Sequence, residues 1–234
     1  AVGAFARVPN ADGTGFVSVF VIAALNMPLG GPPFFFVTGL LGGLGLNRQL
    51  TIPAIQDVPQ HLFIQTLGGT LADNPMGALD LIKTQFPIEH GSFWFAVGLK
   101  FTSFQIIESR AVLFIKIDTG VTIGIVALSA MSLPSKECNI GYVELAILAY
   151  YSSEEQVLWV QAQLTDASYL FSKSCRLTGG FALVTWFKTG EFLLSLGGYH
   201  PRFRATDYYP VVPRIGFNWK PISCITIKGG VYFT

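Results

Sequence analysis

The chain has 234 residues, of which 51% are apolar and only 12% are charged, and its formal net charge is +1. This length suffices for one large domain with a sizeable core. Soluble domains usually contain about 25% charged residues. Either a sheet is therefore covered on both faces, or much of the surface is buried against other protein or lipid. No basic run is dense enough to indicate nucleic acid as a partner.

The charges are distributed unevenly along the chain. Residues 1–172 contain 7 Lys and Arg against 12 Asp and Glu, a balance of −5, whereas residues 173–234 contain 8 against 2, a balance of +6. Opposite charges at two ends could steer head-to-tail contacts between copies or neighbouring modules. Alternatively, these charges simply lie on solvent-exposed faces and steer no contact.

The first elements come from a long uncharged stretch, residues 13–47. About 20 consecutive apolar residues can cross a bilayer as a helix, but the prolines and glycines of 26–33 interrupt this run in its middle. We therefore predict strands at 16–25 and 34–46 joined by a turn, and we do not expect a membrane span. Such near-continuously apolar strands are typical of a sheet that is covered on both faces.

One segment, residues 75–86, departs from the strand pattern. Asp73 or Asn74 is a candidate N-cap, Pro75 occupies the first helical position, and Pro87 ends the helix. The face predicted to pack on the sheet consists of Met76, Leu79, Ile82 and Phe86. We predict one short amphipathic helix here and find no other convincing helix. The conformation of the preceding residues 51–69 stays open, because their prolines argue against a central strand.

Most of the remaining chain alternates between strand-like runs and short turns, as antiparallel hairpins require. The predicted strands are 91–104, 106–118, 120–133, 140–151, 156–165, 179–188, 191–199 and 223–233. We therefore predict an all-β fold of long antiparallel strands in meander order, which form a curled sheet, a sandwich or a barrel-like groove. We interpret residues 1–234 as a single β-rich domain that is a fragment or processed piece of a longer chain.

The residues that usually carry chemistry are few and scattered. The three cysteines and three histidines are Cys138, Cys175, Cys224, His61, His90 and His200. Their spacing fits no zinc site, and we expect buried free thiols, with one disulfide between an unspecified pair as the alternative. We interpret the histidines as turn or surface residues, because no metal-binding, nucleophile or phosphate-loop motif is present. We expect no catalytic residue, no metal and no cofactor.

Two pairs of charges interrupt otherwise apolar strands. Glu108 and Arg110 are separated by two positions, as are Lys116 and Asp118, so each pair shares one face of its strand. We predict cross-strand ion pairs on a solvent-exposed face.

The stretch from Leu196 to Trp219 combines prolines, arginines and aromatic residues. Its prolines lack an N–H and interrupt strand pairing, so the chain should leave the sheet after Tyr199 and rejoin it near Ile215. Arginines over aromatic rings, and a high content of Tyr, Trp and Arg, favour either a loop that caps the chain's own sheet or a protein interface. The candidate residues are Tyr199, His200, Arg202, Phe203, Arg204, Tyr208, Tyr209, Arg214 and Trp219.

A second specialised segment lies near the start of the chain. Its Pro–Gly pairs indicate a sharp turn, and three consecutive phenylalanines supply a large apolar area. The candidate apolar turn consists of Pro32, Pro33, Phe34, Phe35 and Phe36.

Four motifs carry a family resemblance. They read GGPPFFFVTGLLGGLGLNR, GSFWFAVGLKFTSF, CRLTGGFALVTWF and LGGYHPRF…YPVVPRIGFNW…ITIKGGVYF. In order and spacing they resemble domain of unknown function 6603, which occurs in large bacterial and fungal proteins. The resemblance extends from about residue 16 to residue 234. It implies a β-rich, uncharacterised protein whose pattern continues past the point where this chain stops, and it implies no catalytic residue.

The sequence therefore favours a non-enzymatic structural or assembly module. We expect it to associate with copies of itself or with neighbouring modules of the same parent protein, and non-closing head-to-tail contacts would then give filaments. The alternative is the binding or transport of a lipid or another apolar ligand in a β-sheet groove.

Overall fold

Fourteen strands form one antiparallel sheet in the structure, a computed structural model that describes residues 1–9, 15–69, 75–134, 139–222 and 225–234. The first seven strands are β1 (Val2–Pro9), β2 (Gly15–Leu25), β3 (Phe36–Arg48), β4 (Ile88–Ser103), β5 (Ile107–Ile117), β6 (Val121–Pro134) and β7 (Asn139–Ser152). The others are β8 (Val157–Leu164), β9 (Tyr169–Leu170), β10 (Ser172–Thr178), β11 (Gly180–Trp186), β12 (Glu191–Leu196), β13 (Ile215–Ile222) and β14 (Ile225–Val231). The helices are the 3-10 helix η1 (Ile55–Gln60), α1 (Leu62–Gly68) and α2 (Pro75–Gln85).

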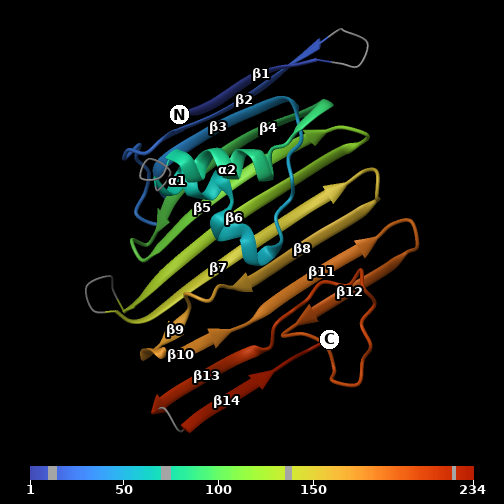
Figure 1. Ribbon diagram of the computed structural model, residues 1–234. Coiled ribbons are helices and arrows are strands. Elements are labelled where there is room, and N and C mark those ends of the chain that lie inside the picture. The colour runs from blue at the N-terminus through green and yellow to red at the C-terminus, as the bar shows by residue number, and fades with distance from the viewer. Residues whose placement is uncertain (10–14, 70–74, 135–138, 223–224) are drawn as a thin grey trace.

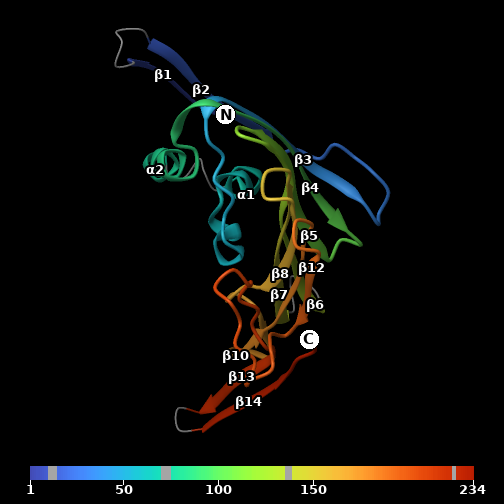
Figure 2. The same ribbon diagram turned by 90° about the vertical axis from the view of Figure 1, so that its right-hand side faces the viewer.

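The strands follow meander order from β1 to β7, and the sheet then divides (Figure 1). One half of β7 pairs with β8, which continues to β11 and β12, whereas its other end pairs with β9, which leads to β10, β13 and β14. A single bridge between Leu196 and Phe233 joins the two branches. The sheet curls without closing (Figure 2). The predicted all-β fold is confirmed as a curled open sheet.

Burial alternates along the strands and defines two faces. On β4, Trp94 and Ala96 are buried, whereas Phe95 and Val97 point the other way and are exposed. We call the face with Trp94 the inner face and the opposite one the outer face. The helices and residues 197–214 all lie on the inner side (Figure 2). The described residues therefore cover only the inner face of the sheet, whereas the apolar strands predict cover on both faces.

The helix α1 follows directly after η1 and was not predicted. His61 is its N-cap and accepts a hydrogen bond from the Phe63 backbone N–H, while Gly69 ends it in the left-handed conformation with φ 83°. Five of its seven residues are buried: Leu62, Phe63, Ile64, Thr66 and Leu67. A helix that is buried on most sides lacks the polar stripe that makes an amphipathic pattern visible.

The predicted helix at 75–86 is present as α2, but its predicted face is partly wrong. Met76 and Leu79 are 72% and 44% exposed, whereas Ala78 and Ile82 are buried. Phe86, which follows the helix, is buried as predicted. The helix α2 packs against α1, and its buried side is the one with Ala78 and Ile82, so the apolar stripe is rotated relative to the one predicted from the large side chains alone. The candidate caps Asp73 and Asn74 lie outside the described residues.

Aromatic side chains from four segments fill the space between the helices and the inner face. The Trp94 ring lies 5.8 Å from that of Phe20, 5.6 Å from that of Phe63 and 5.1 Å from that of Phe86. Gly45 on β3 makes room for this indole, since an added Cβ would lie only 2.2 Å from Trp94 Nε1. The core of the first half of the molecule is therefore centred on Trp94.

Candidate interaction surface

The outer face is largely apolar from β2 to β7; one of its rows contains the hydrogen-bonded Ser109 and Ser129, and Arg7 lies on the same face of the neighbouring edge strand β1. The strand register aligns its side chains in rows across the sheet. One row is Val21, Leu44, Phe95, Ile115 and Ile123. The next is Ala23, Gly42, Val97, Leu113 and Ile125, and it continues through Ala149, Val160, Leu183 and Leu194 to β12. A third is Leu25, Leu40, Leu99, Ala111 and Ala127. No position in these three rows carries a charge or a side-chain hydrogen-bonding group.

Most of the large side chains of these rows are about two-fifths exposed, and Phe95, for example, is 45% exposed, whereas Ile115, Val160 and Leu183 are less exposed. Together they leave an apolar area on the order of 1,000 Å², whereas the largest patch on a typical monomer is about 300–600 Å². About 800 Å² per partner is buried in a standard protein interface. The outer face is therefore large enough to be an interface by itself.

A hollow of about 750 Å³ lies on the outer face over β2 to β6. Its lining consists of Ala23, Ala24, Leu25, Leu40, Leu41, Gly42, Val97, Gly98, Leu99, Ala111, Leu113 and Ile125. The lining includes five small residues, Ala23, Ala24, Gly42, Gly98 and Ala111, and all lining residues are apolar. It is within the size range of sites for drug-sized ligands, about 300–1,000 Å³.

The candidate apolar turn, Pro32 to Phe36, lies beside this hollow. The connection between β2 and β3 projects away from the helices (Figure 2). The Phe35 ring packs 4.7 Å from that of Phe101, which follows the hollow-lining Leu99 on the outer side of β4. Phe104 N–H donates to the Pro33 carbonyl at 3.1 Å, and Phe34 is 59% exposed. The turn therefore extends the apolar surface beyond the sheet.

The aromatic loop, residues 197–214, packs in part on the inner face of the second half of the sheet. Tyr209 stacks on Trp186 with 5.6 Å between ring centroids, and Tyr199 packs on the same cluster. The Tyr199 hydroxyl donates to the Pro210 carbonyl at 2.7 Å, and burial raises its pKa to about 12. Gln161 on β8 donates to the Val211 carbonyl at 3.0 Å. These contacts make one part of the loop a cap on the chain's own sheet.

Arg214 holds the two ends of the aromatic loop together. Its guanidinium donates to the carbonyls of Tyr199 and Gly197 at 2.5 and 3.3 Å, and it stacks over the Tyr232 ring at 3.8 Å. The chain leaves the sheet after Leu196 and returns in β13 at Ile215, close to the predicted positions.

We expect Arg214→Ala to lower the free energy of unfolding by about 1–3 kcal/mol, because two carbonyls lose a charged donor and Tyr232 loses its stacking partner. Urea denaturation measures this loss. Arg202→Ala is the matched control, since Arg202 is exposed and its backbone N–H, not its side chain, bonds to His200; a change below about 0.5 kcal/mol is expected. Equal effects for the two variants would contradict the role of Arg214.

The other candidate residues of this segment do not join the cap in the same way. Those that are exposed are His200, Arg202, Phe203, Arg204 and Tyr208. Tyr208 still makes an edge contact with Trp186 at 5.3 Å, and the Phe203 ring stacks on Tyr209. Trp219 is half-buried on β13, opposite the buried free Cys175 of β10. Cys138 and Cys224 lie outside the described residues.

The strand charges lie on the inner side of the sheet, which corrects the prediction of a solvent face. Glu108 contacts Lys100 of β4 at 3.3 Å and Arg110 of its own strand at 3.7 Å. Lys116 pairs with Asp118 at 2.7 Å along one strand, not across two. Each of these side chains shares its face with Trp94 and Val112, because they occupy the same alternate positions in the register.

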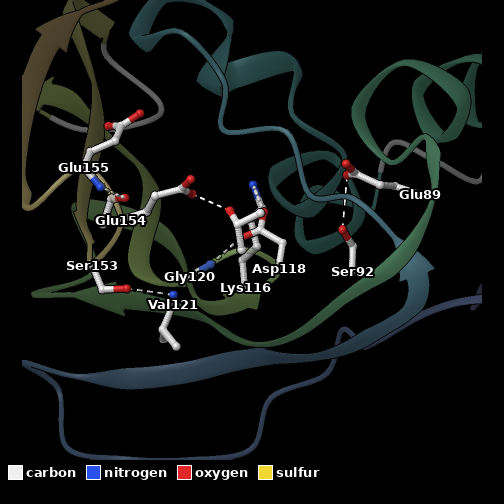
Figure 3. Close-up of polar contacts among 11 residues, drawn as sticks. Glu89, Ser92, Lys116, Asp118, Gly120, Val121, Ser153, Glu154 and Glu155 are labelled. Carbon is white, nitrogen blue, oxygen red and sulfur yellow. Dashed lines mark hydrogen bonds and ion pairs between the residues drawn. The ribbon is translucent and has the colours of Figure 1, made fainter.

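Polar contacts gather at the turns between β5 and β6 and between β7 and β8 (Figure 3). Ser153 accepts a hydrogen bond from the Val121 N–H at 2.9 Å, and Thr119 donates to Glu154. Burial raises the pKa of Asp118, but the Lys116 ammonium and the backbone of Gly120 outweigh this and hold it below its usual value. These groups pair with one another and fasten the two hairpins together.

His61 is fully buried, so its interpretation as a turn or surface residue is wrong. Its Nδ1 accepts the Phe63 N–H, and its Nε2 has no hydrogen-bond partner among the described residues. Burial lowers the pKa of His61 to about 4, and the backbone of Thr51 opposes this shift only in part. The imidazole is therefore neutral at physiological pH and packs as an aromatic core residue.

Within the described ranges, no group of three His, Cys, Asp or Glu side chains is placed to bind a metal ion. In the same part of the chain, no helix has the length and hydropathy to cross a membrane.

In the part of the chain that the structure describes, fold and surface define an open antiparallel sheet with a covered inner face and an uncovered, largely apolar outer face. The chain belongs to DUF6603, a family of unknown function whose model matches residues 1–234. The resemblance drawn from the four sequence motifs is thereby confirmed. No curated protein and no solved structure matches the chain.

Proposed function

We propose that this chain is a non-enzymatic assembly module whose outer face packs against the apolar surface of another protein, either a copy of itself or a neighbouring module of the same parent protein. The observation that carries this proposal is the uncharged outer face. It continues over β2 to β8, β11 and β12 without cover from the described residues. Burial of such a surface is the main favourable term in protein association.

The arrangement of charges supports a face contact over an edge contact. Among the described residues of the edge strand β1 the charged side chain is Arg7, and among those of the edge strand β14 it is Lys228. The two ends of the strand path from β1 to β14 are therefore both positive, so head-to-tail growth through these two edges gains no attraction from these charges. The further edge strand β12 carries Glu191.

The non-enzymatic part of the proposal is supported by the state of the ionisable residues. Glu108, Lys116 and Asp118 have ionic partners, and Glu144 accepts hydrogen bonds from Tyr142 and Thr165 at 2.9 and 2.7 Å. The buried His61 points into an aromatic cluster and lies 4.9 Å from the Phe63 ring. These groups are engaged in holding turns and core, so their visible contacts have a structural explanation.

The hollow favours a second candidate function, the binding of a lipid or another apolar ligand. Its volume of about 750 Å³ and its entirely apolar lining suit an acyl chain. Native mass spectrometry of the purified protein tests this candidate. Lipid that co-purifies at stoichiometric amounts would support it, and protein without bound lipid would count against it.

The assembly function is tested with the double variant Val97→Lys/Leu113→Glu. These two side chains are direct neighbours on β4 and β5, so the new charges can pair across the strands and preserve the fold. We expect the wild-type chain to associate in sedimentation velocity and the double variant to sediment as a folded monomer. The control Leu79→Glu places a charge at a similarly exposed site on α2 and should leave association intact. Equal association of wild type and double variant would refute the outer face as the interface, and a monomeric wild-type chain would refute a copy of itself as the partner.

A further inference from the structure

We infer that the partner of the outer face is a second copy of this chain, related by a two-fold axis that lies in the interface. This inference rests on the proposed assembly function and names its partner. The first observation is the shape of the outer face. A ridge of large side chains, Leu44 and Phe95, runs beside the hollow, whose lining includes Ala23 and Gly42.

Ridge and hollow occupy adjacent rows on the same strands. Leu44 and Gly42 are two residues apart on β3, and Phe95 and Val97 are two residues apart on β4, which corresponds to about 7 Å along a strand. A two-fold axis that runs between the two rows places the ridge of each copy over the hollow of the other. The face is thus complementary to itself, as a closed dimer interface requires.

Gly42 shows that the hollow is not needed by the chain's own packing. A Cβ added at Gly42 would meet no atom within 4 Å, whereas one added at Gly45 would collide with Trp94. Glycine in the middle of a strand is unfavourable, since it adds backbone entropy to the unfolded chain and buries no side chain. The described residues explain Gly45 but leave open space over Gly42, and a partner side chain would fill that space.

The absence of charge in the three rows of the outer face and their apolar area are also consistent with a second copy of this chain as the partner. Because the rows carry no charge, two identical faces meet without electrostatic repulsion, whereas a charged partner would lose hydration without gaining an ion pair. An apolar area on the order of 1,000 Å² is comparable to the roughly 800 Å² per partner of a standard interface. Two copies packed in this way give a layered helix–sheet–sheet–helix particle in which both sheets are covered on both faces.

The test is sedimentation equilibrium of the wild-type chain and of Gly42→Leu. We expect the wild type to have twice the chain mass of 25.4 kDa. Gly42→Leu fills the hollow from within, so we expect at least about tenfold weaker dimerisation with an unchanged or higher melting temperature of the monomer. The matched control Thr84→Leu adds the same side chain at an exposed position of α2 and should dimerise like the wild type.

The outcomes separate this inference from the proposed function. The two-fold dimer is refuted, while the assembly function stands, if Val97→Lys/Leu113→Glu abolishes association but the wild type forms larger open assemblies. The same conclusion follows if Val97→Lys/Leu113→Glu abolishes association but Gly42→Leu associates as tightly as the wild type. A wild-type chain that is monomeric at all concentrations refutes the two-fold dimer and leaves the assembly function only with a neighbouring module as the partner. Stoichiometric lipid that is lost in Gly42→Leu would also overturn the inference and assign the hollow to the lipid.

Discussion

Replacing Trp94 by alanine is expected to lower the free energy of unfolding by about 3–5 kcal/mol, the usual cost of deleting a large buried aromatic side chain. Trp94 is fully buried and touches the rings of Phe20, Phe63 and Phe86. The deletion also leaves an empty space beside Gly45, which has no side chain to fill it. Urea denaturation followed by circular dichroism measures the loss.

The matched control for this prediction is Phe93, the residue directly before Trp94 on the same strand. Phe93 lies on the outer face and is 39% exposed, so Phe93→Ala should change the free energy of unfolding of the monomer by less than about 1.5 kcal/mol. The comparison is made at a protein concentration low enough to suppress association. Similar losses at the two neighbouring positions would contradict the assignment of Trp94 to the inner core and Phe93 to an open face.

Acidification is expected to destabilise the fold through His61. Its pKa is about 4 in the folded chain and about 6.5 when unfolded, so the unfolded state binds more protons between these values and stability is lost as the pH falls through this window. Between pH 7.5 and pH 5 the loss is about 2 kcal/mol, which lowers the melting temperature by roughly 4–8 °C for a domain of this size. Thermal melts at the two pH values measure it.

His61→Phe removes the titrating group and keeps an aromatic ring in the cluster, so the melting temperature of this variant should change much less over the same pH range. The difference between pH values is the relevant quantity, because the substitution also removes the N-cap of α1. His90→Gln, a change at an exposed histidine, should keep the wild-type pH dependence. An equally large acid shift in His61→Phe would show that another group is responsible.

The strand meander could be predicted from the sequence because its signals are local. Alternating apolar runs such as 106–118 and 120–133, joined by short turns, correspond to β5 and β6. Pro75 and Pro87 bracket α2 correctly for the same reason. The branching of the sheet at β7 depends on pairing between distant segments, including the short β9 and the polar β10, which no local pattern indicates.

The interaction surface could be predicted only in part. The apolar content of 16–46 indicated that both strand faces need cover, but a sequence pattern does not say which element supplies it. The cover on one side comes in part from α1, whose buried residues hide its helical period. The aromatic loop and the apolar turn therefore carry the most prominent local signals, whereas Leu113 and Ile125 in the middle of the outer face look like ordinary strand residues in the sequence.

The outer face is best tested by hydroxyl-radical footprinting of the native wild-type particle, with Phe93 and Phe95 as reporters and Phe203 of the aromatic loop as an internal reference. All three side chains are partly exposed in the single chain. We predict strong protection of Phe93 and Phe95 relative to Phe203, and loss of that protection in Val97→Lys/Leu113→Glu. Labelling of Phe93 and Phe95 as intense in the wild type as in this variant would show that the outer face is open to solvent and contradict the assembly function.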